Sequence, residues 1–333
     1  MMNTCLQFSE LLQTFFTDGL MHQRQASPNT IASYRDTFRL LLQFAQQQTG
    51  KPPTKLTMEI LEPAFLGAFL NHLERDRGVC PRSRNVRLAA IHSFFRFVAF
   101  TEPSFVALAQ RVLAIPNKRF DRRPIEYLTR PEIEALLSAP DRATWGGRRD
   151  YAFLLVAAQT GLRISELIGL RCDDVVLGAG GSVRCQGKGR KERSTPLRRD
   201  VVVALRGWLR ERLGNPADPL FPSARGGPLS RDGAERVLAK HVATAGKECP
   251  SLARKRISMH VLRHSVAMDL LQQGVDRSVI ALWLGHESIE TTEVYLHASM
   301  AMKEKALAKA TSSKTRNGRY RPTDRLLTFL KSL

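Results

Sequence analysis

The chain of 333 residues is long enough for two domains of ordinary size. Its hydrophobic share of 43% and charged share of 25% are those of a soluble globular protein. The 51 Lys and Arg residues outnumber the 31 Asp and Glu residues, and the formal net charge of +20 favours a polyanion such as nucleic acid as partner, although a basic protein without such a partner would also fit.

The first 112 residues predict a bundle of helices. Apolar side chains recur at helical spacing in four stretches, 8–16, 31–45, 61–73 and 83–100. The second stretch follows a Ser-Pro pair, a common start of a helix, and it ends at a glycine. We therefore expect an N-terminal helical domain over residues 1–112, with one basic side that contacts DNA.

Basic residues gather on the fourth predicted helix and in the segment that follows it. This segment, residues 113–126, is polar and basic between Pro116 and Pro124, as linkers between domains often are. The candidates for DNA contact are Arg82, Arg84, Arg87, Lys118, Arg119, Arg122 and Arg123. The same charges would also suit a helix surface or a linker exposed to water, and both interpretations stay open here.

A second domain is expected over residues 127–300, followed by a basic tail, residues 301–333. Thr129 with Glu132 three residues later is typical of a helix start, and residues 150–161 predict a buried helix. Short apolar runs between glycine turns in residues 175–197 predict three strands, and helices resume after them. The predicted fold class is mainly α (α+β): an N-terminal helical bundle, then a mixed, mostly helical domain with a small three-stranded antiparallel sheet.

The cysteines and the first residues bear on where the protein works. The five cysteines, an odd set without C-x-x-C spacing, are Cys5, Cys80, Cys172, Cys185 and Cys249. They predict neither a disulfide framework nor a zinc site, and reduced thiols fit an intracellular protein. The N-terminus lacks a basic leader, and no apolar run approaches the ~18–20 residues that span a bilayer. We expect a cytoplasmic protein associated with the nucleoid or plasmids, without a membrane partner.

Two short motifs place a basic side chain beside glycine. In Thr160-Gly-Leu-Arg163 the arginine comes at the start of a helix, where the helix terminus and the guanidinium together would hold a phosphate, although Arg163 could simply pair with Glu166. Gly187-Lys188-Gly189 predicts a β-turn that presents a lysine able to protonate a leaving oxygen, with a solvated basic hairpin as the alternative. The spacing of a nucleotide-binding phosphate loop is absent.

Further polar residues follow in the last third of the chain. His260 and Arg263, three residues apart, would share one face of the first turn of a helix. His264 completes an H-x-x-x-H metal spacing, but no glutamate lies between the histidines and no third ligand is evident, so no metal site is predicted. His286 follows a glycine that ends a helix, and Tyr295 comes nine residues later on an amphipathic segment, where packing is the usual role of a tyrosine.

Taken together, six polar residues carry a resemblance to a known family. They are, in order, Arg163, Lys188, His260, Arg263, His286 and Tyr295, within TGLRISEL, GKGRKER, HVLRHSVA and WLGHESIETTEVYLH. The chain from about Ser27 to His297 resembles the tyrosine recombinases, the phage integrase and Xer-type enzymes. The match is most specific from Asp150 onward, and none of the six positions departs from the family pattern.

The resemblance implies a site-specific recombinase that works without metal, ATP or any cofactor. Tyr295 would attack the scissile phosphorus and leave a 3′-phosphotyrosine, with His260 as its base. The side chains that would stabilise the phosphate oxygens are Arg163, Arg263 and His286, and the acid for the departing 5′ oxygen would be Lys188. A tyrosine has a pKa near ~10, so a neighbouring base is needed for this chemistry at neutral pH.

The expected partners are double-stranded DNA recombination sites and other copies of the chain. By resemblance, four protomers assemble on DNA as a homo-tetramer. The tail ends in an apolar stretch, residues 326–333, that would form a short helix and dock on a neighbouring protomer, although it could also fold back on its own domain.

Three other functions compete with this interpretation. A relaxing enzyme of the type IB topoisomerase kind would use the same residues without choosing a site. An inactive descendant would only bind DNA, and an ordinary helix-turn-helix regulator would explain the charge but not the four motifs together. The task of the recombinase, whether integration, excision, resolution or transposition, and its target sequence stay open at this level.

Overall fold

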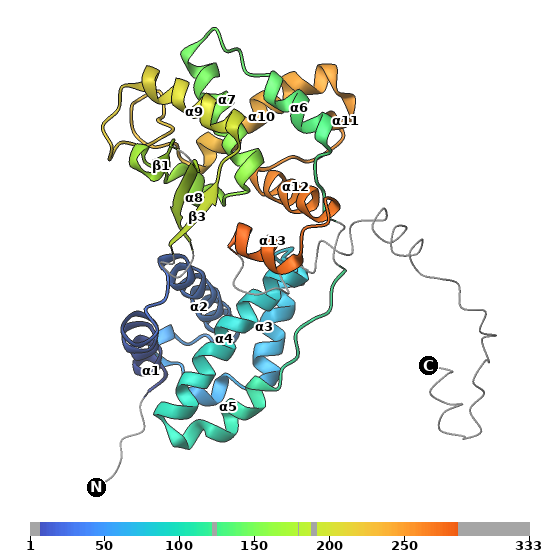
Figure 1. Cartoon of the computed structure of the whole chain (residues 1–333). Helices are drawn as coiled ribbons and strands as arrows, with labels where there is room; N and C mark the ends of the chain where they lie inside the picture. The colour runs from blue at the N-terminus through green and yellow to red at the C-terminus, as the bar shows by residue number, and fades with distance from the viewer. Residues whose placement is uncertain (1–6, 122–124, 179, 188–191, 286–333) are drawn as a thin grey trace, which may run out of the picture. The chain divides into compact units, whose positions relative to one another are not determined.

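The computed structural model describes residues 7–121, 125–178, 180–187 and 192–285. They belong to two compact units, unit 1 (Met1–Arg122) and unit 2 (Arg123–Leu333) (Figure 1). Both units are mostly helical, and the sheet found among the described residues lies in unit 2. The predicted fold class, mainly α with a small three-stranded antiparallel sheet, is confirmed.

Unit 1 is a bundle of helices joined by short turns. Its elements are α1 (Phe8–Thr14), the π-helix η1 (Phe15–Gln23), α2 (Pro28–Thr49), the 3₁₀ turns η2 (Pro53–Lys55) and η3 (Met58–Ile60), α3 (Pro63–Arg75), α4 (Pro81–Thr101), the 3₁₀ turn η4 (Pro103–Phe105) and α5 (Val106–Leu113). Proline stands in the first turn of α2, α3 and α4, where its missing N–H leaves no helix bond unmade. Ser27 caps α2 by accepting a hydrogen bond from the backbone N–H of Thr30.

Phenylalanine rings form the centre of the core of unit 1. The rings of Phe15, Phe38 and Phe94 contact one another with centroids 5.3 to 6.2 Å apart, mostly edge to face. Helix α4 packs against α2, α3 and α5, and it carries a continuous buried stripe. The first predicted helix, 8–16, differs from the structure because the chain continues as the π-helix η1 to Gln23.

Unit 2 combines helices with a small sheet. Its elements are α6 (Arg130–Ser138), α7 (Trp145–Thr160), α8 (Ile164–Ile168), the 3₁₀ turn η5 (Cys172–Asp174), β1 (Val175–Val176), β2 (Ser182–Gln186), β3 (Glu192–Pro196), α9 (Arg199–Arg212), α10 (Arg231–Glu248), α11 (Pro250–Ala253), α12 (Met259–Gln272) and α13 (Arg277–Leu284). Helix α7 begins five residues before the predicted start at Asp150. The reason is a cap, because Thr144 accepts a hydrogen bond from the N–H of Gly147.

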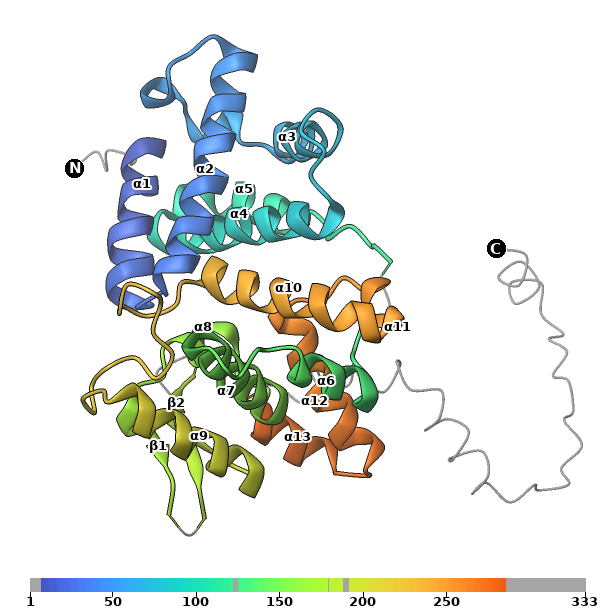
Figure 2. The same cartoon turned by 90° about the horizontal axis from the view of Figure 1, so that it is seen from above.

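The sheet and the helix packing bring distant parts of unit 2 together. The strands pair antiparallel in the order β1-β2-β3, with Val183 opposite both Val175 and Thr195. Helix α7 packs against α9 and against α12, although α12 begins about a hundred residues after α7 ends (Figure 2). As a result, the end of α7 and the start of α12 meet. In the part of the chain described here, no helix is both long and apolar enough to cross a membrane.

Candidate active site

Arg163 is positioned by the turn between α7 and α8. Gly161 follows the last residue of α7 as its C-cap, its φ of 63° is left-handed, and a Cβ there would lie 2.8 Å from Leu284 Cδ2. Arg163 is the N-cap residue of α8, as the sequence predicted, and its guanidinium Nη2 donates to the carbonyl of Gly285 at 2.8 Å. The close contact of Gly161 with α13 therefore brings Arg163 to the residue that precedes His286.

A buried carboxylate holds Arg163 in this orientation. Glu166 accepts a hydrogen bond from the Arg163 backbone N–H and another from its Nη1, each at 2.8 Å. Burial alone would raise the pKa of Glu166, but hydrogen bonds from Arg193 and Arg163 outweigh it and lower that pKa. The pairing of Arg163 with Glu166, which the sequence offers as an alternative to phosphate binding, is present, and the Arg163 side chain is 31% exposed.

Arg263 approaches the same turn from α12. Ser258 caps this helix by accepting from the Val261 N–H, and Arg263 follows one turn later with 3% of its surface exposed. Its Nη1 donates to the carbonyl of Gly161 and its Nη2 to that of Leu284, both at 2.7 Å. Arg163 and Arg263 thus bind the carbonyls of two consecutive residues at the end of α13.

His260 lies one turn before Arg263 and forms a ring contact with His264. The two rings are edge to face with their centroids 4.4 Å apart. Burial lowers the pKa of His264 to about 4, with the His260 and Arg263 charges adding to the effect, so His264 is neutral at neutral pH. Among the described residues, no group of three or more His, Cys, Asp or Glu side chains is arranged to hold a metal ion.

Three residues of the predicted set, Lys188, His286 and Tyr295, lie outside the described residues. In the sequence, Lys188 belongs to the segment between β2 and β3, and His286 directly follows Gly285. The structure therefore brings together Arg163 and Arg263, with His260 on the same helix as Arg263.

The candidates for DNA contact in unit 1 differ in their surroundings. Arg82, Lys118 and Arg119 are exposed. Lys118 donates to both oxygens of Glu74 at 3.0 Å, and Arg84 lies 3.8 Å from the same carboxylate. Arg87 donates to the hydroxyl of Thr37 at 3.3 Å and so ties α4 to α2. Arg122 and Arg123 lie outside the described residues.

Sequence reasoning did not single out Arg193, a residue of β3 that also binds Glu166. Its Nη1 and Nη2 donate to the two carboxylate oxygens at 3.1 and 2.8 Å. The residue was visible in the motif GKGRKER, but nothing in the sequence links it to a carboxylate 27 positions earlier.

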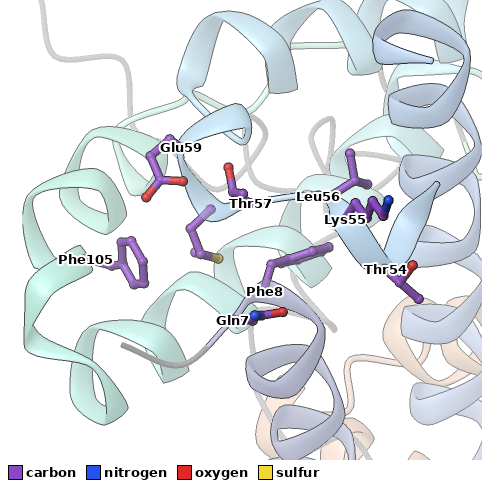
Figure 3. Close-up of a pocket in the computed structure, with 9 residues that line it drawn as sticks. Gln7, Phe8, Thr54, Lys55, Leu56, Thr57, Glu59 and Phe105 are labelled. Atoms are coloured by element: carbon purple, nitrogen blue, oxygen red, sulfur yellow. The ribbon is translucent and has the colours of Figure 1, made fainter. Parts of the chain in front are cut away.

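Unit 1 contains a pocket of its own. It has a volume of about 400 Å³ and lies between the start of α1, the segment from Thr54 to Glu59 and Phe105 (Figure 3). Its polar side chains include Lys55 and Glu59 but none of the candidates named above. The arginine pair in unit 2 therefore remains the candidate active site.

Two family models match the sequence. Residues 126–302 match the model described as the phage integrase family, and residues 14–100 match the model described as the phage integrase N-terminal SAM-like domain.

Similar proteins and structures agree with these matches. A Sinorhizobium fredii protein named as an integrase/recombinase, y4rC, is 57% identical over 97% of each chain. The tyrosine recombinase XerD of Pseudomonas putida is 33% identical over 86% of this chain and 92% of its own. Two solved structures share the fold. The Tn1549 transposon integrase with circular intermediate DNA has a TM-score of 0.67 and 18% sequence identity, and the match covers 89% of this chain and 98% of that chain. A lambda integrase tetramer on a Holliday junction has a TM-score of 0.60 and 17% identity, and the match covers 88% of this chain and 78% of that chain.

Proposed function

Because the chain belongs to the phage integrase family of tyrosine recombinases, we propose that it is a site-specific recombinase whose Tyr295 forms a 3′-phosphotyrosine with DNA. Enzymes of this family break and rejoin DNA strands by phosphoryl transfer. The observation that supports the proposal best is the convergence of Arg163 and Arg263 on the carbonyls of Leu284 and Gly285, next to His286 in the sequence.

Charge stabilisation is the role that we propose for the two arginines. A phosphodiester in its transition state carries negative charge on the non-bridging oxygens, and guanidinium groups held in fixed positions bind such oxygens in a defined geometry. Arg163 is fixed by Glu166 and Gly285, and Arg263 by Gly161 and Leu284. Neither side chain then needs to reorganise when the charge develops. We propose that His286 donates a further hydrogen bond to the same phosphate.

The remaining steps are assigned by the chemistry that they require. The phenolic oxygen of Tyr295 forms a bond with phosphorus while the bond to the 5′ oxygen breaks, with His260 receiving the phenolic proton and Lys188 giving a proton to the 5′ oxygen. The new phosphodiester bond conserves the energy of the old one, so religation by the same path in reverse requires no ATP. The proposal uses no metal ion or cofactor in any step.

The proposed partners are double-stranded recombination sites and three further copies of the chain. Among proteins that share the fold, one solved complex is a XerH recombinase bound to a palindromic difH substrate and another is the lambda integrase tetramer. We propose that residues 326–333 dock on a neighbouring protomer and that the enzyme works in the cytoplasm, on the nucleoid or plasmids.

We also propose a division of the chain by role. Residues 1–112 would form the core DNA-binding domain, 113–126 a basic linker along the DNA, 127–300 the catalytic domain and 301–333 the tail. The separation of the two compact units at Arg122 and Arg123, inside the proposed linker, supports this division.

The nucleophile is tested with a nicked suicide substrate, which traps the covalent complex. Tyr295→Phe should bind the substrate with unchanged affinity and form no adduct on a denaturing gel. An adduct in Tyr295→Phe would end the assignment of Tyr295. Cleavage of any sequence at equal rate would favour a relaxing topoisomerase over a site-specific recombinase.

The acid is tested with a substrate whose 5′ bridging oxygen is replaced by sulfur, a better leaving group that needs no proton. Lys188→Ala should cleave the ordinary substrate slowly and the sulfur substrate at close to the wild-type rate. If the sulfur substrate does not rescue the variant, Lys188 is not the acid.

A further inference from the structure

Arg193 grips the carboxylate that orients Arg163. It is the second residue of β3, opposite Cys185 of β2, and its side chain is 15% exposed. Its two terminal nitrogens donate to the two oxygens of Glu166 at 3.1 and 2.8 Å, a bidentate ion pair of the strong kind. The strand that follows the Lys188 segment is thereby fixed to the start of α8.

Glu166 divides its hydrogen bonds equally between the two arginines. Each carboxylate oxygen accepts one bond from Arg163 and one from Arg193, and only 3% of the side chain is exposed. Without Arg193, half of these bonds would be lost and Arg163 alone would hold the buried carboxylate. The negative charge of Glu166 would then be paired with Arg163 alone, and Arg163 is the group that faces the phosphate in the proposed mechanism. Arg193 balances this charge and leaves that of Arg163 to act on the substrate.

Arg193 also contacts the end of α13. A Cβ on Gly285 would lie 2.2 Å from Arg193 Nη1 and 2.8 Å from its Cζ, so the guanidinium packs directly against the backbone of this residue. The carbonyl of Gly285 is the acceptor for Arg163 Nη2. One side chain of β3 therefore contacts both groups that fix Arg163, the Glu166 carboxylate and the Gly285 backbone.

We propose that Arg193 is a positioning residue for DNA cleavage, which aims Arg163 at the scissile phosphate by holding Glu166 and Gly285. This inference rests on the proposed role of Arg163 in charge stabilisation. Arg193 does not itself need to touch DNA for this role. The alternative is that the Arg193–Glu166 pair stabilises the fold and has no separate effect on the reaction.

The test compares Arg193→Gln with a matched control, Arg148→Gln. Arg148 forms a bidentate pair with Glu211 in the same unit, with both distances 2.7 Å, and among the described residues it has no hydrogen bond to Arg163, His260 or Arg263. Three quantities are measured for each variant: the single-turnover rate of adduct formation on the suicide substrate, the DNA affinity and the melting temperature. Arg193→Gln should slow cleavage about 10²-fold, the typical effect of misplacing a reacting group, with affinity changed less than about twofold. Arg148→Gln should cleave at the wild-type rate.

The coupling to Arg163 separates positioning from general stability. In an Arg163→Ala background, adding Arg193→Gln should slow cleavage by less than about threefold, because the group that Arg193 positions is already gone. An equal slowing in both backgrounds would overturn the inference, and so would a wild-type rate in Arg193→Gln. If Arg193→Gln does not fold, Arg193→Lys is put through the same comparison, with a partial loss of rate expected because one ammonium cannot make both bonds.

The Arg163→Ala variant distinguishes a failure of the proposed function from a failure of the role proposed for Arg193. A wild-type cleavage rate in Arg163→Ala would refute the role of Arg163 itself. A slow Arg163→Ala combined with a fast Arg193→Gln would refute only the role of Arg193.

Discussion

The backbone carbonyls of Leu284 and Gly285 each accept a hydrogen bond from a different arginine. Arg263 is the more buried of the two donors, and it also binds the carbonyl of Gly161. These two bonds run to carbonyls at the ends of α7 and α13, so the guanidinium helps to fix the relative position of the two helices. The Arg263 side chain therefore has two roles: it joins α7 to α13, and it is itself the group proposed to bind the phosphate.

Arg263→Lys should therefore affect reaction and fold together. A lysine ammonium has no planar fork and cannot reach both carbonyls in the same geometry. We expect cleavage to fall ~10²–10³-fold, the usual effect of losing one preorganised donor, and the free energy of unfolding to fall by about 1–3 kcal/mol because a buried carbonyl loses its partner. Single-turnover adduct formation and urea denaturation measure the two effects. An unchanged cleavage rate in a folded variant would contradict the role of Arg263.

At the scale of elements, the junction of α7 with α13 requires a glycine. Gly161 has a left-handed backbone, and Leu284 Cδ2 occupies the space of a Cβ. The carbonyl of the same residue accepts from Arg263. The turn thus couples the end of one helix to the end of another that lies more than a hundred residues later in the chain.

Gly161→Ala should destabilise unit 2 and displace the arginine site. The left-handed conformation alone costs about 1–3 kcal/mol for a residue with a side chain, and Leu284 must also move. Gly146→Ala is the control, because Gly146 lies in the first turn of α7 and nothing is within 4 Å of its Cβ position. Its melting temperature should stay level or rise. Equal melting temperatures for Gly161→Ala and the wild type would contradict this description of the junction.

A second cluster ties α6 to the chain before α12. Glu132 of α6 accepts hydrogen bonds from Lys255, Ser251 and the backbone of Thr129, and 2% of the residue is exposed. Burial alone would raise the pKa of Glu132, but these partners outweigh it and lower the pKa to about 2. Since the folded pKa lies below the unfolded one of ~4.3, the resulting stability is present above that unfolded value and is lost as the pH falls toward 2.

Glu132→Gln should lower the free energy of unfolding at neutral pH by roughly 1.5–3 kcal/mol, the range for a hydrogen bond to a charged group. The difference in free energy of unfolding between the variant and the wild type should shrink as the pH is lowered from about 6 to about 3. Over this range the stability that the ionised Glu132 contributes to the wild type is progressively lost. Glu134→Gln on the same helix is the control, because Glu134 is exposed and pairs with the exposed Arg130. A difference that stays constant with pH would show that Glu132 is not the titrating group.

At the scale of the whole molecule, the charge of +20 bears on DNA binding through individual side chains. Arg82 is exposed on α4, whereas Lys118 is held by Glu74. Arg82→Ala should weaken binding to all sequences and reduce the slope of log affinity against log salt by ~0.9, the value for one phosphate contact. Lys118→Ala should change the slope less. Equal slopes for Arg82→Ala and the wild type, measured by fluorescence anisotropy, would place Arg82 away from the DNA.

The sequence predicted those features that depend on local chemistry. The helix starts at Ser27 and Thr129 and the three-stranded sheet have short-range signals, and the structure contains them. The motifs around Arg163 and Arg263 indicated a shared target, and the structure brings these two residues to one turn.

Other features depend on tertiary packing and have no local signal. The start of α7 at Trp145 is not evident from the sequence, because the next two residues are glycines, which disfavour helix. The cap at Thr144 stabilises the helix start in spite of them. The pairing of Arg193 with Glu166 and the sharing of Glu74 by Lys118 and Arg84 join residues that are distant in the sequence. Composition and periodicity carry no information on such pairs.

Peptide mapping of the trapped adduct tests the central proposal most directly. The chain contains five tyrosines, Tyr34, Tyr127, Tyr151, Tyr295 and Tyr320, and the tryptic peptide of residues 278–303 contains only Tyr295. After nuclease digestion of a wild-type complex with the suicide substrate, mass spectrometry should find the nucleotide phosphate on this peptide, at the tyrosine. A nucleotide phosphate on any other peptide would contradict the assignment of Tyr295. Failure to form a covalent adduct on a DNA site that the protein cleaves would contradict the phosphotyrosine mechanism.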